Sequence, residues 1–159
     1  DLRVELKRIQ ANLGATLLYV THDQIEAMTM ATHVGVLNEG KLVQFGTPRE
    51  IYENPNSLYV ASRLGLPRIN VLPADIFGNV PHGTTQIGLR PEHIRQGEGL
   101  NAVVQRVEHL GDQNRLHLVL NGHIITTIAD PASEYEPGTH LKITPNNPLC
   151  FDASGDRIR

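Results

Sequence analysis

Apolar residues near the start of the chain change from helical spacing to an unbroken run. One face of a predicted helix is marked by apolar residues four, three and four positions apart, namely Leu2, Leu6, Ile9 and Leu13. Gly14 follows directly, where a left-handed residue commonly ends a helix. Residues 16–20 are then almost continuously apolar, as in a strand buried on both faces of a parallel sheet. The pattern predicts a helix followed by a parallel strand.

The next part is predicted to hold a β-hairpin and short helices. Two β runs at 33–37 and 41–45 flank a short loop that contains glycine, which indicates a hairpin. Residues 47–50 read Thr-Pro-Arg-Glu, with an N-cap, a proline at the first helical position and a glutamate at the third. That helix must end by Asn54, because the residue before a proline disfavours helix. A further helix is expected within residues 57–64.

The chain changes character near residue 66, after which short strands and turns dominate. Strands are predicted at 85–89, 102–107, 116–120, 123–128 and 141–143. Asn121-Gly122 between two of them is the strongest short-range hairpin signal, because both turn positions need positive φ. Several short strands with regular turns predict a small barrel or sandwich.

Composition narrows the class of protein. The 14 Lys and Arg against 17 Asp and Glu give a net charge of −3, and aromatic residues make up 4%. This balance argues against nucleic acid as a partner, since such proteins present a basic face with stacking aromatics. The single cysteine, Cys150, lies between Leu149 and Phe151 and is predicted to be a small apolar core residue. No stretch approaches the roughly 20 apolar residues of a membrane span.

His22 is the strongest candidate for chemistry. It follows the predicted strand, at the sheet edge where α/β proteins bind ligands. Its imidazole can donate a hydrogen bond to a phosphate oxygen, although a histidine there can also bond its own loop. Asp23 and Glu26 have the spacing of a helix N-cap and its capping-box partner, which we favour over catalytic carboxylates. The other histidines lack compact metal-ligand spacing, so no metal site is predicted. His117 and His123 are expected to face each other as a solvated pair.

An ordered series of motifs identifies a family resemblance. It comprises Thr21-His22-Asp23-Gln24, Glu26-Ala27-Met28-Thr29, Gln44-Phe45-Gly46-Thr47-Pro48, Gly65-Leu66-Pro67-Arg68-Ile69-Asn70, Leu89-Arg90-Pro91-Glu92, Val107-Glu108-His109-Leu110-Gly111 and Phe151-Asp152. In this order they resemble the ATPase subunits of bacterial ABC importers of the maltose and glycerol-phosphate type, which carry a C-terminal regulatory domain. The resemblance covers nearly the whole chain.

The resemblance implies an α/β remnant of a P-loop ATPase domain at 1–65. An all-β regulatory barrel, OB-like and of the TOBE or MOP type, would follow at 66–159. With Asp1 opening directly on a helix, we expect the chain to be the C-terminal part of a longer protein. That parent would bind ATP and Mg²⁺ through motifs upstream. The sequence contains no G-x-x-x-x-G-K-[ST] loop, so the chain alone is expected to bind no cofactor and to be inactive as an ATPase.

The resemblance also implies roles and partners. His22 would contact the nucleotide as a catalytic residue that senses the γ-phosphate of ATP. The partners would be a second copy of the subunit, integral membrane permease subunits and a regulatory protein on the β domain, at the cytoplasmic face of the bacterial inner membrane. The cargo would be a sugar or related polar solute. The alternative is a free-standing OB-like module for oxyanion binding or protein interaction. Arg90-Pro91-Glu92 is either a structural turn or a domain or dimer contact.

Overall fold

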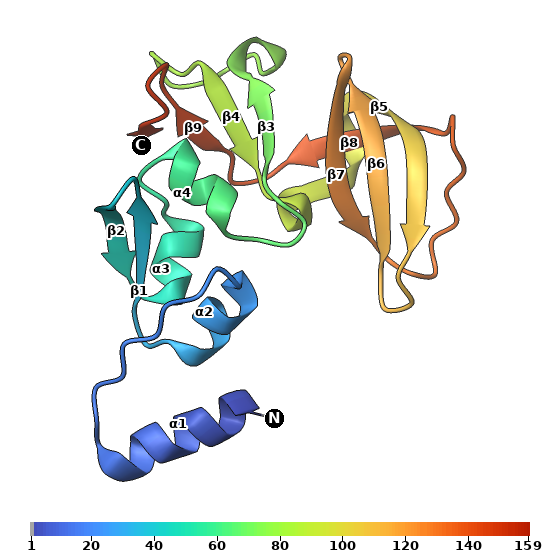
Figure 1. The fold of residues 1–159 in the computed structure, drawn as a ribbon. Helices are drawn as coiled ribbons and strands as arrows, with labels where there is room; N and C mark the ends of the chain where they lie inside the picture. Colours follow the sequence, from blue (N-terminus) through green and yellow to red (C-terminus); the bar gives the residue numbers. More distant parts are fainter. Residues whose placement is uncertain (1) are drawn as a thin grey trace. The chain divides into compact units, whose positions relative to one another are not determined.

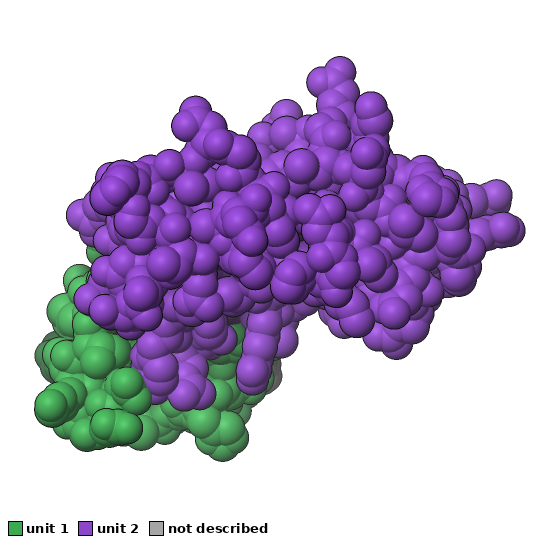
Figure 2. Space-filling view, turned by 90° about the horizontal axis from the view of Figure 1, so that it is seen from above, with its two compact units in different colours: residues 1–56 green, residues 57–159 purple. Residues whose placement is uncertain are grey.

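The computed structural model describes residues 2–159, and the chain forms two compact units. The division lies between Asn56 and Ser57 (Figure 2). The helix predicted within residues 57–64 therefore clusters with the β-rich unit. The division into compact units does not test the predicted boundary between the ATPase and regulatory domains at residues 65 and 66, which stays a prediction.

Residues 2–56 of the first unit form three helices and one hairpin (Figure 1): α1 (Leu2–Leu13), α2 (Gln24–Met30), β1 (Val34–Asn38), β2 (Lys41–Gly46) and α3 (Pro48–Glu53). The first predicted helix is confirmed, and Gly14 follows it with a φ of 61°. The hairpin is confirmed as an antiparallel pair, with Glu39 and Gly40 both at positive φ in its loop. The Lys7 ammonium connects α1 to α2 by donating to the Thr29 carbonyl at 2.7 Å.

The cap of α3 is the one that the sequence predicts. Thr47 Oγ1 accepts from the Glu50 amide at 3.3 Å, and the Glu50 carboxylate accepts from the Thr47 amide at 2.8 Å. Both halves of the capping box are therefore present, with Pro48 in the first turn. The helix ends at Glu53, with Asn54 as its C-cap, as predicted. Ile51, on α3, is fully buried.

The predicted strand at residues 16–20 is wrong for this structure. These residues have no regular secondary structure, and Leu18 and Val20 are 89% and 85% exposed. A strand needs a neighbour to receive its backbone hydrogen bonds. In the part of the chain that the structure describes, sheet pairing joins only other segments, so this run has no partner strand. Its apolar side chains remain in solvent.

The second unit is mainly β. Its elements are α4 (Leu58–Arg63), β3 (Asn70–Pro73), a 3₁₀ turn (Ala74–Ile76), β4 (Gln86–Leu89), a second 3₁₀ turn (Pro91–His93), β5 (Ile94–His109), β6 (Asn114–Leu120), β7 (His123–Ala129), β8 (His140–Pro145), β9 (Leu149–Phe151) and β10 (Arg157–Ile158). Two four-stranded antiparallel sheets result, in the orders β10-β9-β4-β3 and β7-β6-β5-β8. The helix predicted within residues 57–64 and the strand regions predicted after residue 66 are confirmed.

The two sheets share one hydrophobic core. Side chains alternate along β6, so that Leu116, Leu118 and Leu120 are buried while their neighbours are partly exposed. Asn121 and Gly122 have φ values of 48° and 81°, which confirms the predicted tight hairpin between β6 and β7. Cys150 is a free thiol that is 6% exposed within this core, as predicted.

Asn70 joins the edges of the two sheets. Its side-chain amide donates to the Leu89 carbonyl at 3.1 Å and to the Thr126 carbonyl at 2.8 Å. Its Oδ1 accepts from the Thr126 amide at 2.7 Å. Asn70 therefore connects β3, where it lies, both to its neighbour β4 and to β7 of the other sheet. No helix within residues 2–159 is both long and apolar enough to cross a membrane.

Candidate functional site

His22 lies in a short turn between the irregular segment and α2. Its side chain is exposed. The segment before it contributes Tyr19 and Thr21, and the helix after it contributes Glu26. Because Tyr19 and Thr21 both donate hydrogen bonds to Glu26, the turn has a defined shape around the exposed imidazole.

The turn is fixed by bonds that converge on Glu26 and Thr21. Thr21 Oγ1 donates to Glu26 Oε2 at 2.7 Å, and the Tyr19 hydroxyl donates to the same oxygen at 3.2 Å. Thr21 Oγ1 in turn accepts from the Asp23 amide at 3.0 Å. Residues on both sides of His22 are thus held by side-chain bonds, and the imidazole is left facing solvent.

Asp23 is the N-cap of α2, the reading that the sequence favours over a catalytic carboxylate. Its Oδ1 accepts from the Ile25 amide at 2.8 Å and from the Glu26 amide at 3.2 Å. In a full capping box the Glu26 carboxylate would accept from the Asp23 amide. Here Thr21 Oγ1 accepts from that amide instead, and the Glu26 carboxylate accepts from Thr21 and Tyr19. Both acids therefore have structural roles in this turn.

The electrostatics of the turn follow from the same contacts. The hydrogen bond that Tyr19 donates to the Glu26 carboxylate, together with that negative charge, raises the pKa of the Tyr19 phenol. The phenol therefore stays protonated and keeps donating to Glu26. An exposed imidazole beside such a turn can donate a hydrogen bond to an oxyanion brought to it. The geometry is open enough for a phosphate oxygen to approach from solvent.

The predicted pairing of His117 with His123 is wrong. In the register of β6 and β7, His117 lies opposite Thr126, and His123 lies opposite Leu120. Alternate strand residues point to opposite faces, and only the directly opposed residues of a hairpin meet. Within residues 2–159 there is no group of three or more His, Cys, Asp or Glu side chains arranged to hold a metal ion.

His117 belongs instead to a cluster of charges around Glu108. Glu108 Oε1 lies 3.0 Å from His117 Nε2 and 2.6 Å from Arg106 Nη2, and Oε2 lies 3.2 Å from Arg115 Nη1. Partial burial is the largest single influence on the pKa of Glu108, and it acts to raise that pKa. The His117 hydrogen bond and the two arginine charges together outweigh it, so the pKa is lowered.

Arg90 is a buried anchor whose role the sequence leaves open. Its side chain is 2% exposed, and Nη1 donates to the Ala61 carbonyl at 3.2 Å and also to the Leu64 carbonyl. These are acceptors at the C-terminal end of α4, where carbonyls lack helical partners. The arginine of the Arg90-Pro91-Glu92 motif therefore fastens α4 to the end of β4. The bonds lie within one compact unit and support the structural reading of the motif.

Comparison with known proteins agrees with these features. A family model described as the TOBE domain matches residues 87–151. A protein named sn-glycerol-3-phosphate import ATP-binding protein UgpC 2, from Rhizobium johnstonii, is 38% identical, with 99% of this chain and 44% of the relative aligned. The protein named UgpC from Ruegeria pomeroyi is 42% identical over 77% of this chain and 39% of its own length.

The chain spans about half the length of the curated relatives that it matches; for the UgpC protein of Ruegeria sp. the share is 51%, at 38% identity. The mainly-β second unit and the TOBE match together fit the predicted OB-like barrel. Residues 87–151 thus match the TOBE domain, in a chain homologous to part of longer ABC-transporter ATP-binding proteins.

Proposed function

We propose that this chain is the C-terminal part of an ATP-hydrolysing subunit that powers ABC-type import of a polar solute. The solute would be a sugar or a related polar compound. That class includes sn-glycerol 3-phosphate, the compound in the names of the relatives. The observation that carries the proposal is the fixed turn around His22, within a chain homologous to such subunits over nearly all its length. The free-standing module is the less favoured alternative, because these relatives are much longer proteins.

His22 is the residue proposed to sense the γ-phosphate of ATP. Its imidazole is exposed, and the Thr21 and Asp23 bonds hold the backbone on either side. In phosphoryl transfer the protein contributes mainly by positioning the reacting groups and by stabilising the charge on the transferred phosphoryl group. A hydrogen-bond donor on a fixed backbone is suited to both tasks. ATP and Mg²⁺ supply the transferred phosphoryl group and its counter-charge in the parent. Of this chain's residues, His22 alone is proposed to contact the nucleotide.

The first unit is proposed to be the remnant of the P-loop ATPase domain. Its exposed apolar segment at residues 16–20 agrees with this proposal, since a strand of an ATPase sheet would bury such side chains. The assembled protein would pair with a second copy of itself and with integral membrane permease subunits, at the cytoplasmic face of the inner membrane. The β-rich unit is proposed to regulate, through dimer contacts and a regulatory protein.

The test is ATP turnover by the parent protein assembled with its permease. We expect His22→Ala to abolish most turnover while ATP still binds, because the imidazole acts on the γ-phosphate after binding. His82→Ala, a change in an exposed loop, is the matched control and should keep full turnover. The isolated chain should show no hydrolysis, since it lacks the phosphate-binding loop sequence. Near-normal turnover in His22→Ala would refute the assignment.

A further inference from the structure

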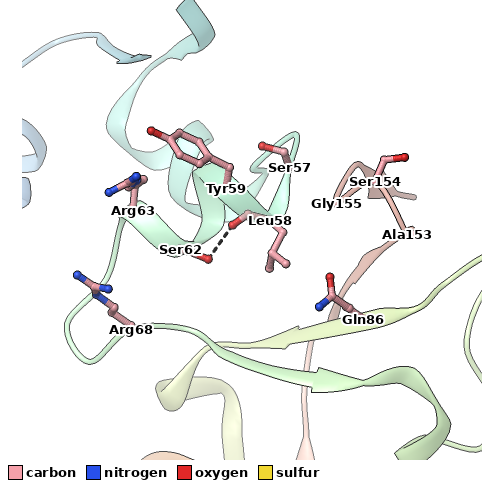
Figure 3. A pocket seen from close by; sticks show the side chains of 10 residues that line it. All are labelled: Ser57, Leu58, Tyr59, Ser62, Arg63, Arg68, Gln86, Ala153, Ser154 and Gly155. Carbon is pink, nitrogen blue, oxygen red and sulfur yellow. Dashed lines mark hydrogen bonds between the residues drawn. The ribbon is translucent and has the colours of Figure 1, made fainter. Parts of the chain in front are cut away.

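The β-rich unit has a cavity of about 520 Å³ beside α4. Its walls come from α4, the loop after it, β4 and the turn that precedes β10 (Figure 3). All of these belong to one compact unit, so the cavity is defined by the fold of that unit alone. Its size falls within the range of small-molecule sites, about 300–1,000 Å³.

The cavity is positively charged. Arg63 and Arg68 line it, no carboxylate does, and both guanidinium groups lie at the same end (Figure 3). Among residues 2–159, neither arginine forms an ion pair with an Asp or Glu side chain. The Arg63 guanidinium carbon lies 4.6 Å from the centre of the Tyr59 ring, which orients the group without neutralising it. Two uncompensated charges at one end are suited to a bound anion.

Asp152 and Asp156 flank the lining residues 153–155 in sequence, and neither lines the cavity. Asp152 Oδ1 accepts from the Ser154 amide at 2.8 Å and from the Asp156 amide at 3.0 Å, which closes the turn. Asp152 does not line the cavity, and its carboxylate closes the turn instead of forming an ion pair with either arginine. The turn places Ser154 on the side of the cavity opposite the arginines (Figure 3).

Neutral polar groups line the rest of the cavity. The Gln86 carboxamide projects from β4 toward it, opposite the arginine end (Figure 3). Ser62 Oγ donates to the Leu58 carbonyl at 2.7 Å, which leaves its oxygen lone pairs as acceptors. Leu58 adds an apolar surface. A ligand with one anionic end and a small polar body would match this division of charge.

We propose that the cavity binds a small organic phosphate monoester. The phosphate would lie between Arg63 and Arg68, whose planar forks match its oxygens bidentately. The organic body would extend toward Gln86 and Ser154, since the cavity is larger than a phosphate group needs. The proposal stands apart from the function proposed for His22, which lies in the other compact unit.

The test is titration of the chain followed by amide NMR signals from α4 and from residues 153–155. The probes are sn-glycerol 3-phosphate, glucose 6-phosphate, inorganic phosphate and glycerol, at constant ionic strength. We expect saturable shifts with both esters and none with glycerol. The double variant Arg63→Gln/Arg68→Gln should weaken ester binding at least tenfold. Both arginines are exposed, so the variant should fold, and Arg95→Gln, at another exposed arginine, should bind as wild type.

Several outcomes would overturn the proposal. One is ester binding that survives the double substitution, and another is shifts that sulfate at equal ionic strength reproduces. A third is arginine-dependent binding to phosphatidylglycerol vesicles without any binding of the soluble esters, which would assign the charge to a lipid surface. Absence of any ester binding at millimolar concentration would also reject it.

Discussion

Replacement of Asn70 is expected to loosen the connection between the two sheets of the β-rich unit. The Asn70 amide group makes three hydrogen bonds, two to the backbone of Thr126 and one to the Leu89 carbonyl. Asn70→Ala removes all three and leaves backbone groups of two strands without these partners. No other side chain connects β3 and β7 among the hydrogen bonds of the part of the chain described here.

The magnitude follows from the number of bonds and from burial. Each hydrogen bond contributes a net of about 0.5–1.5 kcal/mol, so three give about 1.5–4.5 kcal/mol. Asn70 is only partly buried, and water can replace some of the lost bonds. We therefore expect Asn70→Ala to lower the free energy of unfolding by about 2–3 kcal/mol. For a domain of this size that is a fall in Tm of about 10–20 °C.

The assay is urea unfolding of the chain, followed by amide NMR signals of β6 and β7, which report on the β-rich unit. Asn79→Ala, at an exposed loop position, should change the free energy of unfolding by no more than about 0.5 kcal/mol. Asn70→Asp is a second test. The aspartate keeps the acceptor for the Thr126 amide but places a carboxylate beside the Leu89 and Thr126 carbonyls. The loss of unfolding free energy in this variant should therefore be smaller at acidic pH, where the carboxylate is protonated. Equal stability of Asn70→Ala and Asn79→Ala would refute the reasoning.

Two further predictions concern a helix cap and a charge cluster. Thr47→Ala removes the capping oxygen of α3, which costs about 1 kcal/mol of stability. Hydrogen exchange of the Glu50 amide should therefore become about fivefold faster. The control is Arg49→Ala, which removes only an exposed ion pair, and an equal effect in that variant would contradict the prediction. The pKa of Glu108 is lower in the folded state, so its stabilising contribution is complete above the ordinary carboxylate pKa and is lost as pH falls through the folded value. Glu108→Gln should therefore flatten the acid limb of stability against pH measured by urea unfolding. An unchanged slope would show that the contacts of Glu108 with His117 and the two arginines do not lower its pKa.

Local signals in the sequence predict local structure well. The capping box at Thr47 and Glu50 and the turn at Asn121-Gly122 use side chains and glycine within a few residues of the backbone they fix. The same holds for Asp23, whose carboxylate caps the helix that begins at the next residue. Such devices satisfy nearby backbone groups whatever the rest of the chain does, so periodicity and spacing reveal them.

Contacts between distant residues are where the sequence falls short. Nothing in the motif around Arg90 says that its guanidinium will reach carbonyls 26 and 29 residues earlier in the chain. Likewise, Asn70 and Thr126 are 56 residues apart, and no periodicity links them. The cavity beside α4 depends on a turn near residue 154, so nothing in the sequence indicates that Arg63 and Arg68 line one cavity. Burial and partner identity decide these roles, and only the folded topology supplies them.

The segment at residues 16–20 shows why an apolar run alone does not make a strand. Its composition suits the interior of a parallel sheet, yet each strand backbone must give its hydrogen bonds to neighbours. Where those neighbours are lacking, the run stays irregular and Leu18 stays exposed. The adjoining turn forms regardless, because Thr21, Asp23 and Glu26 supply their own partners. The local geometry around His22 therefore depends on side chains within residues 19–26 rather than on the sheet, which is why the turn is formed here without it.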